Sequence, residues 1–225
     1  MRLSLALLFG MALSCGTTCA LAQLADGSAV EPREWEVGAY VGIARNSPVG
    51  THLGMTPDRD HLFLGVHVTK PILRWKRWSL AYAPEVVPLL LVSNGPKCVT
   101  EQSPVIGGSA CVTTTGDPGW VRGVAIVPVG VESQIRIARR WRVYGGAAAG
   151  VAWFTRPVPD PGARAFNYTI EFGGGLQWQF RRREWLRVGY KFHHLSNAYT
   201  APSNPGVDGN VFLIGFGVAL RSLQS

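Results

Sequence analysis

Apolar and polar side chains alternate along most of this chain, which is the pattern of β-strands whose two faces meet different surroundings. The segment 166–180, FNYTIEFGGGLQWQF, is the clearest example. Phe166, Ile170 and Trp178 share one face with other apolar residues, whereas Glu171 lies on the other face among glycines and amides. The alternation therefore predicts an all-β chain.

Segments of this kind recur along the chain, near residues 34–45, 59–70, 77–91, 121–137, 141–155, 166–180, 184–198 and 208–221. Several exceed the five or six residues of an ordinary soluble strand and reach the length of about nine to eleven that a tilted strand needs to cross a bilayer. Short basic turns alternate with longer loops rich in Pro, Gly, Asn and Ser, as in outer-membrane barrels with periplasmic termini. The sequence predicts an eight-stranded antiparallel transmembrane β-barrel of the outer membrane.

A soluble, lipocalin-like barrel is the alternative fold, with its apolar face turned inward. Periodicity does not separate inside from outside, but aromatic strand ends and a glycine-rich second face favour the membrane barrel. In a soluble binder, Leu176 and Trp178 would be buried. Six tryptophans are interpreted as interfacial belt residues, those at positions 75, 78, 120, 141, 153 and 185.

The N-terminus has the features of a secretory signal peptide. Arg2 precedes an apolar run that ends in the small-residue site Ala20-Leu21-Ala22, which predicts cleavage before Gln23. An N-terminal membrane anchor is the alternative, but the apolar run is too short for one. We therefore expect a signal peptide over 1–22 and a single β-barrel domain over 23–225.

Two cysteines remain in the mature chain, since Cys15 and Cys19 leave with the signal peptide. Cys98 and Cys111 lie in the longest loop, about 92–120. In an exported protein, a disulfide that closes a short loop is the natural interpretation.

The formal net charge is +8, and the basic residues cluster in three short stretches, 73–78, 138–142 and 180–185. Export argues against nucleic acid as a partner. Basic turns next to a membrane indicate contact with anionic head groups of outer-membrane lipids, and solvated turns are the alternative.

Reactive side chains collect near the C-terminus on one strand face. His194 and Ser196 continue the apolar parity of Tyr190, and Asp208 has the same parity on the next strand. A histidine beside a serine, with a carboxylate to orient it, is the arrangement for nucleophilic acyl transfer, and Asn197 or nearby backbone N–H groups could stabilise the oxyanion. The alternative is a polar strand end that reaches interfacial water.

Other titratable residues are interpreted as parts of the barrel interior. His193 and Glu171 have lumen parity and are expected to be hydrogen-bonded there. His61 and His67 share a lumen parity but are six residues apart, too far for an adjacent pair of metal ligands. No metal site is predicted.

The run FHHLSNAYTAPSNPGVD, residues 192–208, resembles the C-terminal signature of the outer-membrane lipid A 3-O-deacylases of the PagL type. In that resemblance His194 matches the base, Ser196 the nucleophile and Asn197 the oxyanion-hole asparagine. Asp208 stands where the family usually has glutamate, which is one methylene longer. Either the strands lie closer here or the acid is less well placed.

The resemblance covers about the last 35 residues. It implies an eight-stranded barrel in the outer membrane of a Gram-negative bacterium. It also implies a carboxylic ester hydrolase that removes the 3-O-linked 3-hydroxyacyl chain from the lipid A of lipopolysaccharide, without a metal or organic cofactor. A non-catalytic small barrel with a structural or adhesion role is the alternative function.

Overall fold

The computed structural model describes most of the chain after the predicted signal peptide. It covers residues 35–48, 51, 53–94, 97–102, 109–114 and 119–220, with the backbone alone within 94–114. The predicted signal peptide, 1–22, lies outside the described residues. In the part of the chain that is described, no helix is long and apolar enough to cross a membrane.

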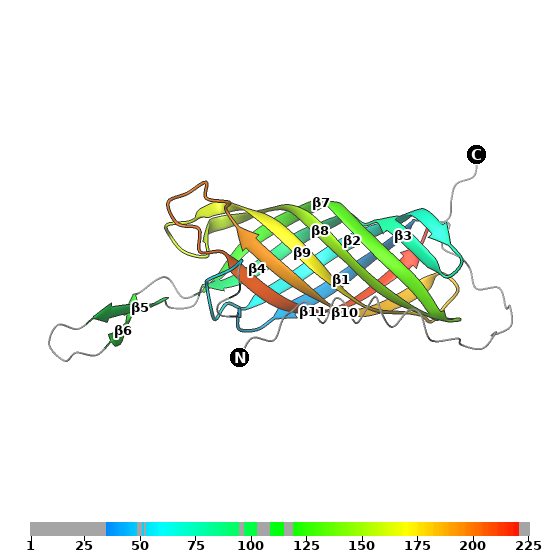
Figure 1. Cartoon of the computed structure of the whole chain (residues 1–225), viewed down its shortest axis with the longest axis horizontal. Helices are drawn as coiled ribbons and strands as arrows, with labels where there is room; N and C mark the ends of the chain where they lie inside the picture. The colour runs from blue at the N-terminus through cyan, green and yellow to red at the C-terminus, as the bar shows by residue number, and fades with distance from the viewer. Residues whose placement is uncertain are drawn as a thin grey trace.

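The strands, in chain order, are β1 (Glu36–Ala44), β2 (His61–Trp75), β3 (Trp78–Tyr82), β4 (Glu85–Asn94), β5 (Lys97–Gln102), β6 (Ser109–Thr114), β7 (Gly119–Ala138), β8 (Trp141–Val158), β9 (Arg164–Gln179), β10 (Glu184–Ser196) and β11 (Val207–Ala219). The named strands pair antiparallel, and the main sheet closes because β1 pairs with both β11 and β2. Between β2 and β7, β3 and β4 lie end to end and fill one position of the ring. The ring thus has eight positions, which confirms the predicted eight-stranded barrel (Figure 1).

The predicted third strand, 77–91, is interrupted at Ala83 and Pro84. Proline has no N–H to give to a ladder, so a strand tends to break or bulge there. The two residues at the interruption still form hydrogen bonds to both neighbouring strands. The Ala83 N–H donates to the Gly130 carbonyl of β7 at 2.9 Å, and the Val68 N–H of β2 donates to the Pro84 carbonyl at 3.0 Å.

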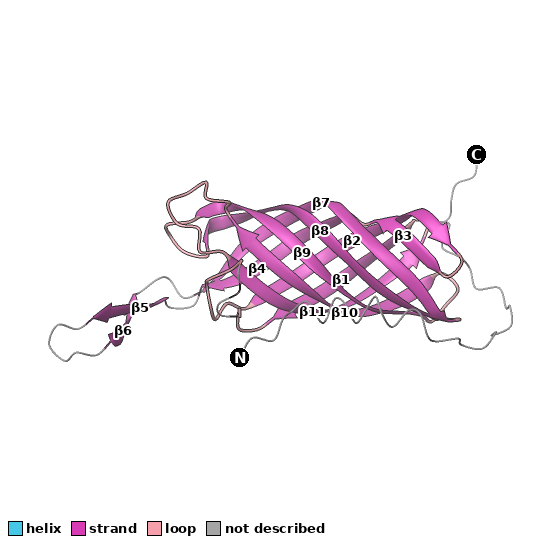
Figure 2. Ribbon diagram, viewed as in Figure 1, coloured by secondary structure: helices cyan, strands magenta, loops and turns pink. Residues whose placement is uncertain are grey.

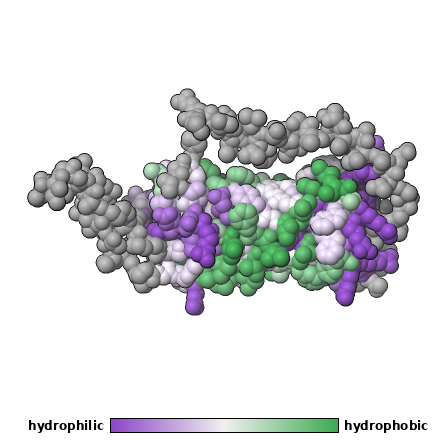
Figure 3. All heavy atoms as spheres, turned by 90° about the horizontal axis from the view of Figure 1, so that it is seen from below, coloured by the Kyte–Doolittle hydropathy of each residue, from purple (hydrophilic) through white to green (hydrophobic). Residues whose placement is uncertain are grey.

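The apolar faces of the strands turn outward. Leu176 and Trp178 are 39% and 37% exposed, which excludes the alternative of a soluble barrel with these side chains inside and agrees with the predicted membrane barrel. Figure 3 shows an apolar band between two polar ends of the barrel. The prediction that Trp185 belongs to the interfacial belt is wrong. Trp185 is 2% exposed, because its side chain has the same parity as Arg187 and points into the lumen.

The two ends of the barrel differ in their connections (Figures 1 and 2). At one end, here called the turn end, short turns join β2 to β3, β7 to β8, and β9 to β10. Strand β1 begins and β11 finishes there, since Glu36 pairs with Ala219. The opposite end, the loop end, carries the longer connections, including 45–60 and 197–206.

The predicted disulfide lies in the connection between β4 and β7. Strands β5 and β6 form a separate two-stranded sheet, in which Cys98 pairs with Thr113 and Cys111 with Thr100. The two cysteines are therefore on facing strands and two positions out of register. Their side chains lie outside the described part of the structure, so the disulfide stays a prediction.

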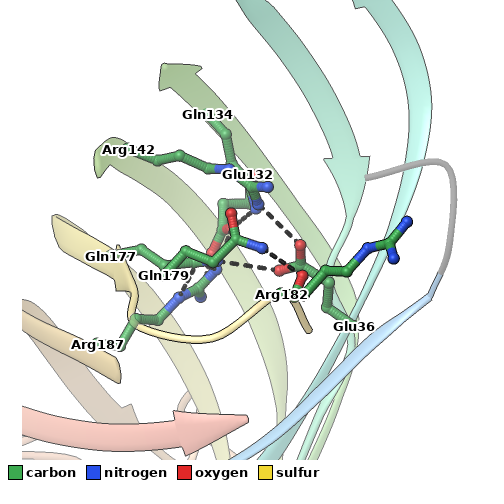
Figure 4. A network of polar contacts seen from close by, with 8 residues as sticks. All are labelled: Glu36, Glu132, Gln134, Arg142, Gln177, Gln179, Arg182 and Arg187. Carbon is green, nitrogen blue, oxygen red and sulfur yellow. Dashed lines mark hydrogen bonds and ion pairs between the residues drawn. The ribbon is translucent and has the colours of Figure 1, made fainter. Parts of the chain in front are cut away.

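Charged side chains fill the lumen near the turn end (Figure 4). Arg187 forms a bidentate ion pair with Glu132, with both N–O distances 2.8 Å. Its Nε and Nη2 also donate to Gln177 Oε1, at 2.9 and 2.7 Å. Arg142 donates to Glu36 at 2.8 Å. Small barrels fill their interior with side chains, and here polar ones pair across the lumen.

A second network lies closer to the loop end. Lys191 Nζ donates to Glu171 at 2.8 Å and to Glu85 at 2.9 Å, and the Tyr40 hydroxyl also donates to Glu85. His193 Nδ1 lies 2.7 Å from the second oxygen of Glu171. These contacts confirm the predicted lumen positions of His193 and Glu171, and they leave no buried carboxylate of this network without a partner.

Candidate active site

His194 and Asp208 face each other on adjacent strands. They are register partners on β10 and β11, and His194 Nδ1 lies 2.6 Å from Asp208 Oδ1. Both residues are buried, with exposed fractions of 5% and 1%. Aspartate is therefore long enough at this position, because two directly opposed residues of an antiparallel pair have close Cα atoms.

Ser196 is the last residue of β10 and lies two positions beyond His194, so both side chains have the same parity. At 3.4 Å of rise per residue the two Cα atoms are about 6.8 Å apart along the strand. The side chain of Ser196 is half-buried, whereas that of His194 is buried. Among the hydrogen bonds of the described residues, none joins the serine hydroxyl to the imidazole; such bonds are often long in enzymes without substrate.

The β1–β2 loop, residues 45–60, covers His194 and Asp208. Met55 N–H donates to the Pro205 carbonyl at 2.7 Å, Thr56 N–H donates to the Gly206 carbonyl at 3.2 Å, and Thr56 forms a parallel bridge with Val207. These bonds attach the β1–β2 loop to the start of β11. His194 and Asp208 keep the predicted outward parity, but the loop shields them, unlike the exposed outward residues Tyr190 and Phe212 of the same strands.

The same loop holds the carboxylate of Asp208. Gly54 N–H donates to Asp208 Oδ2 at 3.0 Å, and the Thr51 hydroxyl donates to the same oxygen. The other oxygen, Oδ1, is left for His194. A Cβ at Gly54 would lie 2.6 Å from Asp208 Cγ, so only glycine allows this approach.

Sequence reasoning missed Thr51 and Gly54. The two lie 157 and 154 residues from Asp208. Their only local signal is a Thr-x-x-Gly turn, in which Gly54 N–H also donates to Thr51 Oγ1 at 2.9 Å. That signal predicts a turn and not a contact with another strand.

Gly206 packs closely against the imidazole of His194. Its φ is 60°, a left-handed conformation that glycine adopts readily, and a Cβ there would lie 3.1 Å from His194 Cε1. The Asn204-Pro205-Gly206 run is a turn signal in the sequence, but its packing against the imidazole is a tertiary contact.

Asn197, the predicted oxyanion residue, is buried next to the serine. Its side-chain amide donates to the Ser203 carbonyl at 2.7 Å, and its backbone N–H donates to Asn204 Oδ1 at 2.9 Å. An asparagine amide has two N–H groups, so one remains for another acceptor. The observed bonds tie the 197–206 loop to the end of β10.

A histidine held by a buried carboxylate, with a serine two positions away, can take a proton from a hydroxyl and return it to a leaving group. Here this group of residues lies on the outward face at the loop end of the barrel. The fold and the site together define the class: an eight-stranded β-barrel of the outer-membrane type, with a histidine, a serine and an aspartate on one outward face at its rim.

The comparisons with known proteins agree with this class. The model of the PagL family, described as lipid A 3-O-deacylase, matches residues 105–217, half of the chain, and the chain belongs to this family. The match includes all four predicted site residues, His194, Ser196, Asn197 and Asp208.

The solved structure of PagL has the same fold, and two further solved structures match with lower scores. The outer membrane enzyme PagL is 14% identical, with a TM-score of 0.52 over 82% of this chain and 99% of that chain. Neisserial surface protein A is 10% identical, with a TM-score of 0.47 over 83% of this chain and 97% of that one. OprG from Pseudomonas aeruginosa is 10% identical, with a TM-score of 0.44 over 84% and 96%. No curated protein sequence matches the chain significantly.

Proposed function

We propose that this protein is an outer-membrane esterase that removes the 3-O-linked 3-hydroxyacyl chain from lipid A. The observation that carries the proposal is the 2.6 Å contact between His194 Nδ1 and Asp208 Oδ1, with Ser196 on the same outward face. A barrel with a purely structural role gains nothing from a buried charge-bearing pair on its outer wall. Membership of a lipid A 3-O-deacylase family supports the choice of substrate.

In the proposed reaction Ser196 Oγ attacks the ester carbonyl carbon while His194 Nε2 accepts the serine proton. Asp208 holds the Nδ1–H tautomer and stabilises the imidazolium. The ester C–O bond then breaks, and His194 gives the proton to the 3-oxygen of lipid A. Water, deprotonated by the same histidine, releases the fatty acid from the acyl-serine. The second amide N–H of Asn197, or backbone N–H groups near it, would stabilise the oxyanion.

The position of the site fits a substrate that stays in the membrane. Below Ser196 the outer face of β10 continues through half-buried Phe192 to exposed Tyr190 and Val188, an apolar surface along which an acyl chain can lie. Long loops of outer-membrane barrels are extracellular, so the loop end is expected at the outer leaflet, where lipid A resides.

The direct test is mass spectrometry of lipid A from Gram-negative cells with and without this protein. The proposal expects loss of one 3-hydroxyacyl chain, and only when the protein is present. Unchanged lipid A in cells that contain the folded barrel would favour a non-catalytic barrel instead.

Asp208→Asn is expected to lower the deacylation rate by about 10³- to 10⁴-fold without unfolding the barrel. Gly54 N–H and the Thr51 hydroxyl both donate to Oδ2, so the asparagine oxygen is expected there and its NH₂ would face His194. That contact favours the tautomer with the proton on Nε2, which cannot accept the serine proton. Initial rates on lipid A vesicles measure the loss; a rate equal to that of the unchanged protein means that another acid orients the histidine.

Gly54→Ala is expected to reduce the rate by about ten- to a hundredfold, because the new Cβ displaces the carboxylate and misplacements of about 1 Å have effects of this size. Gly119→Ala is the matched control, since a Cβ there meets its nearest atom, Arg156 Nη2, only at 3.9 Å. The measurement compares the deacylation rates of the two variants at equal amounts of folded barrel. Equal rates for both would mean that the contact between Gly54 and Asp208 does not position the acid.

A further inference from the structure

A basic pocket opens at the turn end, between the β2–β3 turn and the β7–β8 turn. Its volume is about 40 Å³, which leaves room for a small polar group the size of a few water molecules. Seven of the thirteen residues that line it are arginine or lysine, and none is aspartate or glutamate. Such a concentration of one charge attracts an anion.

Hydrogen bonds of the lumen network hold one lining residue of the pocket, Arg142, in place. Arg142, which lines the pocket, donates to Glu36 at 2.8 Å and to Gln134 at 3.4 Å (Figure 4). Glu132, the neighbouring buried carboxylate, is already paired with Arg187. Glu36 thus balances the charge of Arg142 and Glu132 that of Arg187, and neither carboxylate lines the pocket.

Backbone hydrogen bonds hold the two turns that carry the exposed cations. Arg136 N–H donates to the Arg77 carbonyl at 2.8 Å, and Gln179 N–H donates to the Arg140 carbonyl at 2.8 Å. The side chains of Arg77, Arg139 and Arg140 are exposed around the opening. The backbone of both turns is therefore already fixed before an anion binds, and only the arginine side chains have to become ordered.

Exposed tryptophans place this pocket at the level of lipid head groups. Trp75 is 69% exposed next to the β2–β3 turn, and Trp141, which follows the β7–β8 turn, stacks on Trp178 with ring centroids 6.0 Å apart. Tryptophans of membrane proteins gather at the boundary between the hydrocarbon layer and the head groups. The phosphates of the surrounding leaflet lie at that depth.

We propose that this pocket binds the phosphate of an anionic glycerophospholipid in the leaflet at the turn end. Arginine suits a phosphodiester because its planar fork donates two parallel hydrogen bonds. In helical membrane proteins, basic pockets at the membrane surface bind the head groups of anionic phospholipids. The site is separate from the ester-cleaving residues, which lie at the opposite end of the barrel, and it does not depend on them.

The test compares binding of short-chain phosphatidylglycerol and phosphatidylcholine to the purified barrel in neutral detergent, followed by tryptophan fluorescence. The unchanged protein is expected to bind phosphatidylglycerol more tightly. The triple variant Arg77→Gln, Arg139→Gln, Arg140→Gln is expected to lose at least about tenfold in affinity for it. No preference between the two lipids would overturn the proposal.

A matched control removes the same charge from a different turn. Arg181→Gln, Arg182→Gln, Arg183→Gln changes the β9–β10 turn, whose side chains do not line the pocket, and is expected to weaken binding less than about threefold. Equal losses in the two triple variants would show attraction by net charge alone. A third arm adds inorganic phosphate: displacement of the lipid at equal concentration would show a site for a free ion and contradict the lipid assignment.

Discussion

Replacement of Ser196 by alanine is expected to stop the release of the 3-hydroxyacyl chain while the barrel still folds. Loss of the nucleophile in a serine hydrolase lowers kcat by about 10⁴- to 10⁶-fold, since neither histidine nor carboxylate can form the acyl intermediate. The side chain is half-buried at the end of β10 and small, so alanine leaves the strand pairing unchanged. Lipid A from cells that make the variant should keep its full set of acyl chains by mass spectrometry.

Ser93→Ala is the matched control for this result. Ser93 also lies toward the loop end, on β4, where its hydroxyl accepts the Asp60 N–H at 2.8 Å. The control should deacylate lipid A at the rate of the unchanged protein. If the Ser196 variant still removes the acyl chain, Ser196 is not the nucleophile, and the proposed mechanism is refuted.

Replacement of Arg187 by methionine is expected to destabilise the barrel by about 3–5 kcal/mol, the usual loss when one partner of a buried ion pair is removed. Arg187 is 4% exposed and donates to Glu132 and Gln177 in the lumen. Its guanidinium also lies 4.2 Å from the ring centroid of Tyr144. Without it, the Glu132 carboxylate remains buried and loses its ion-pair partner.

Urea unfolding of the barrel in lipid vesicles, followed by tryptophan fluorescence, measures this loss. The double variant Glu132→Gln, Arg187→Met should regain part of the stability, because a neutral amide is less costly to bury than a carboxylate. Gln134 Nε2, which donates to Glu132 at 2.7 Å, can still donate to the new amide oxygen. A single variant as stable as the unchanged protein, or a double variant no more stable than the single one, would contradict the assigned role of the pair.

Local side-chain periodicity was sufficient to predict the strands and their two faces. A strand repeats every two residues, so the parity that places Leu176 and Trp178 together can be read without a structure. The same rule put His194, Ser196 and Asp208 on one face. It also placed Glu171 and His193 in the lumen, where each contacts the other. Where that parity was not applied, as for Trp185, the prediction was wrong.

Closure of the sheet decided which face is the outside. Alternation is the same for a soluble and a membrane barrel, and the difference appears only when the ring fixes its interior. The interior then brings together charges far apart in sequence, such as Arg142 and Glu36, which are 106 residues apart. No local pattern encodes which lumen carboxylate will meet which cation.

The sequence by itself determined the strand faces and the serine, histidine and aspartate at the end of two neighbouring strands, because these depend on spacing along a strand. Only the tertiary structure decided how the aspartate is held. Thr51 and Gly54 reach Asp208 because barrel closure brings β1 beside β11, and the β1–β2 loop then folds over the start of β11. That contact depends on the geometry of the closed ring, and residues near Thr51 and Gly54 in the sequence carry no signal for it.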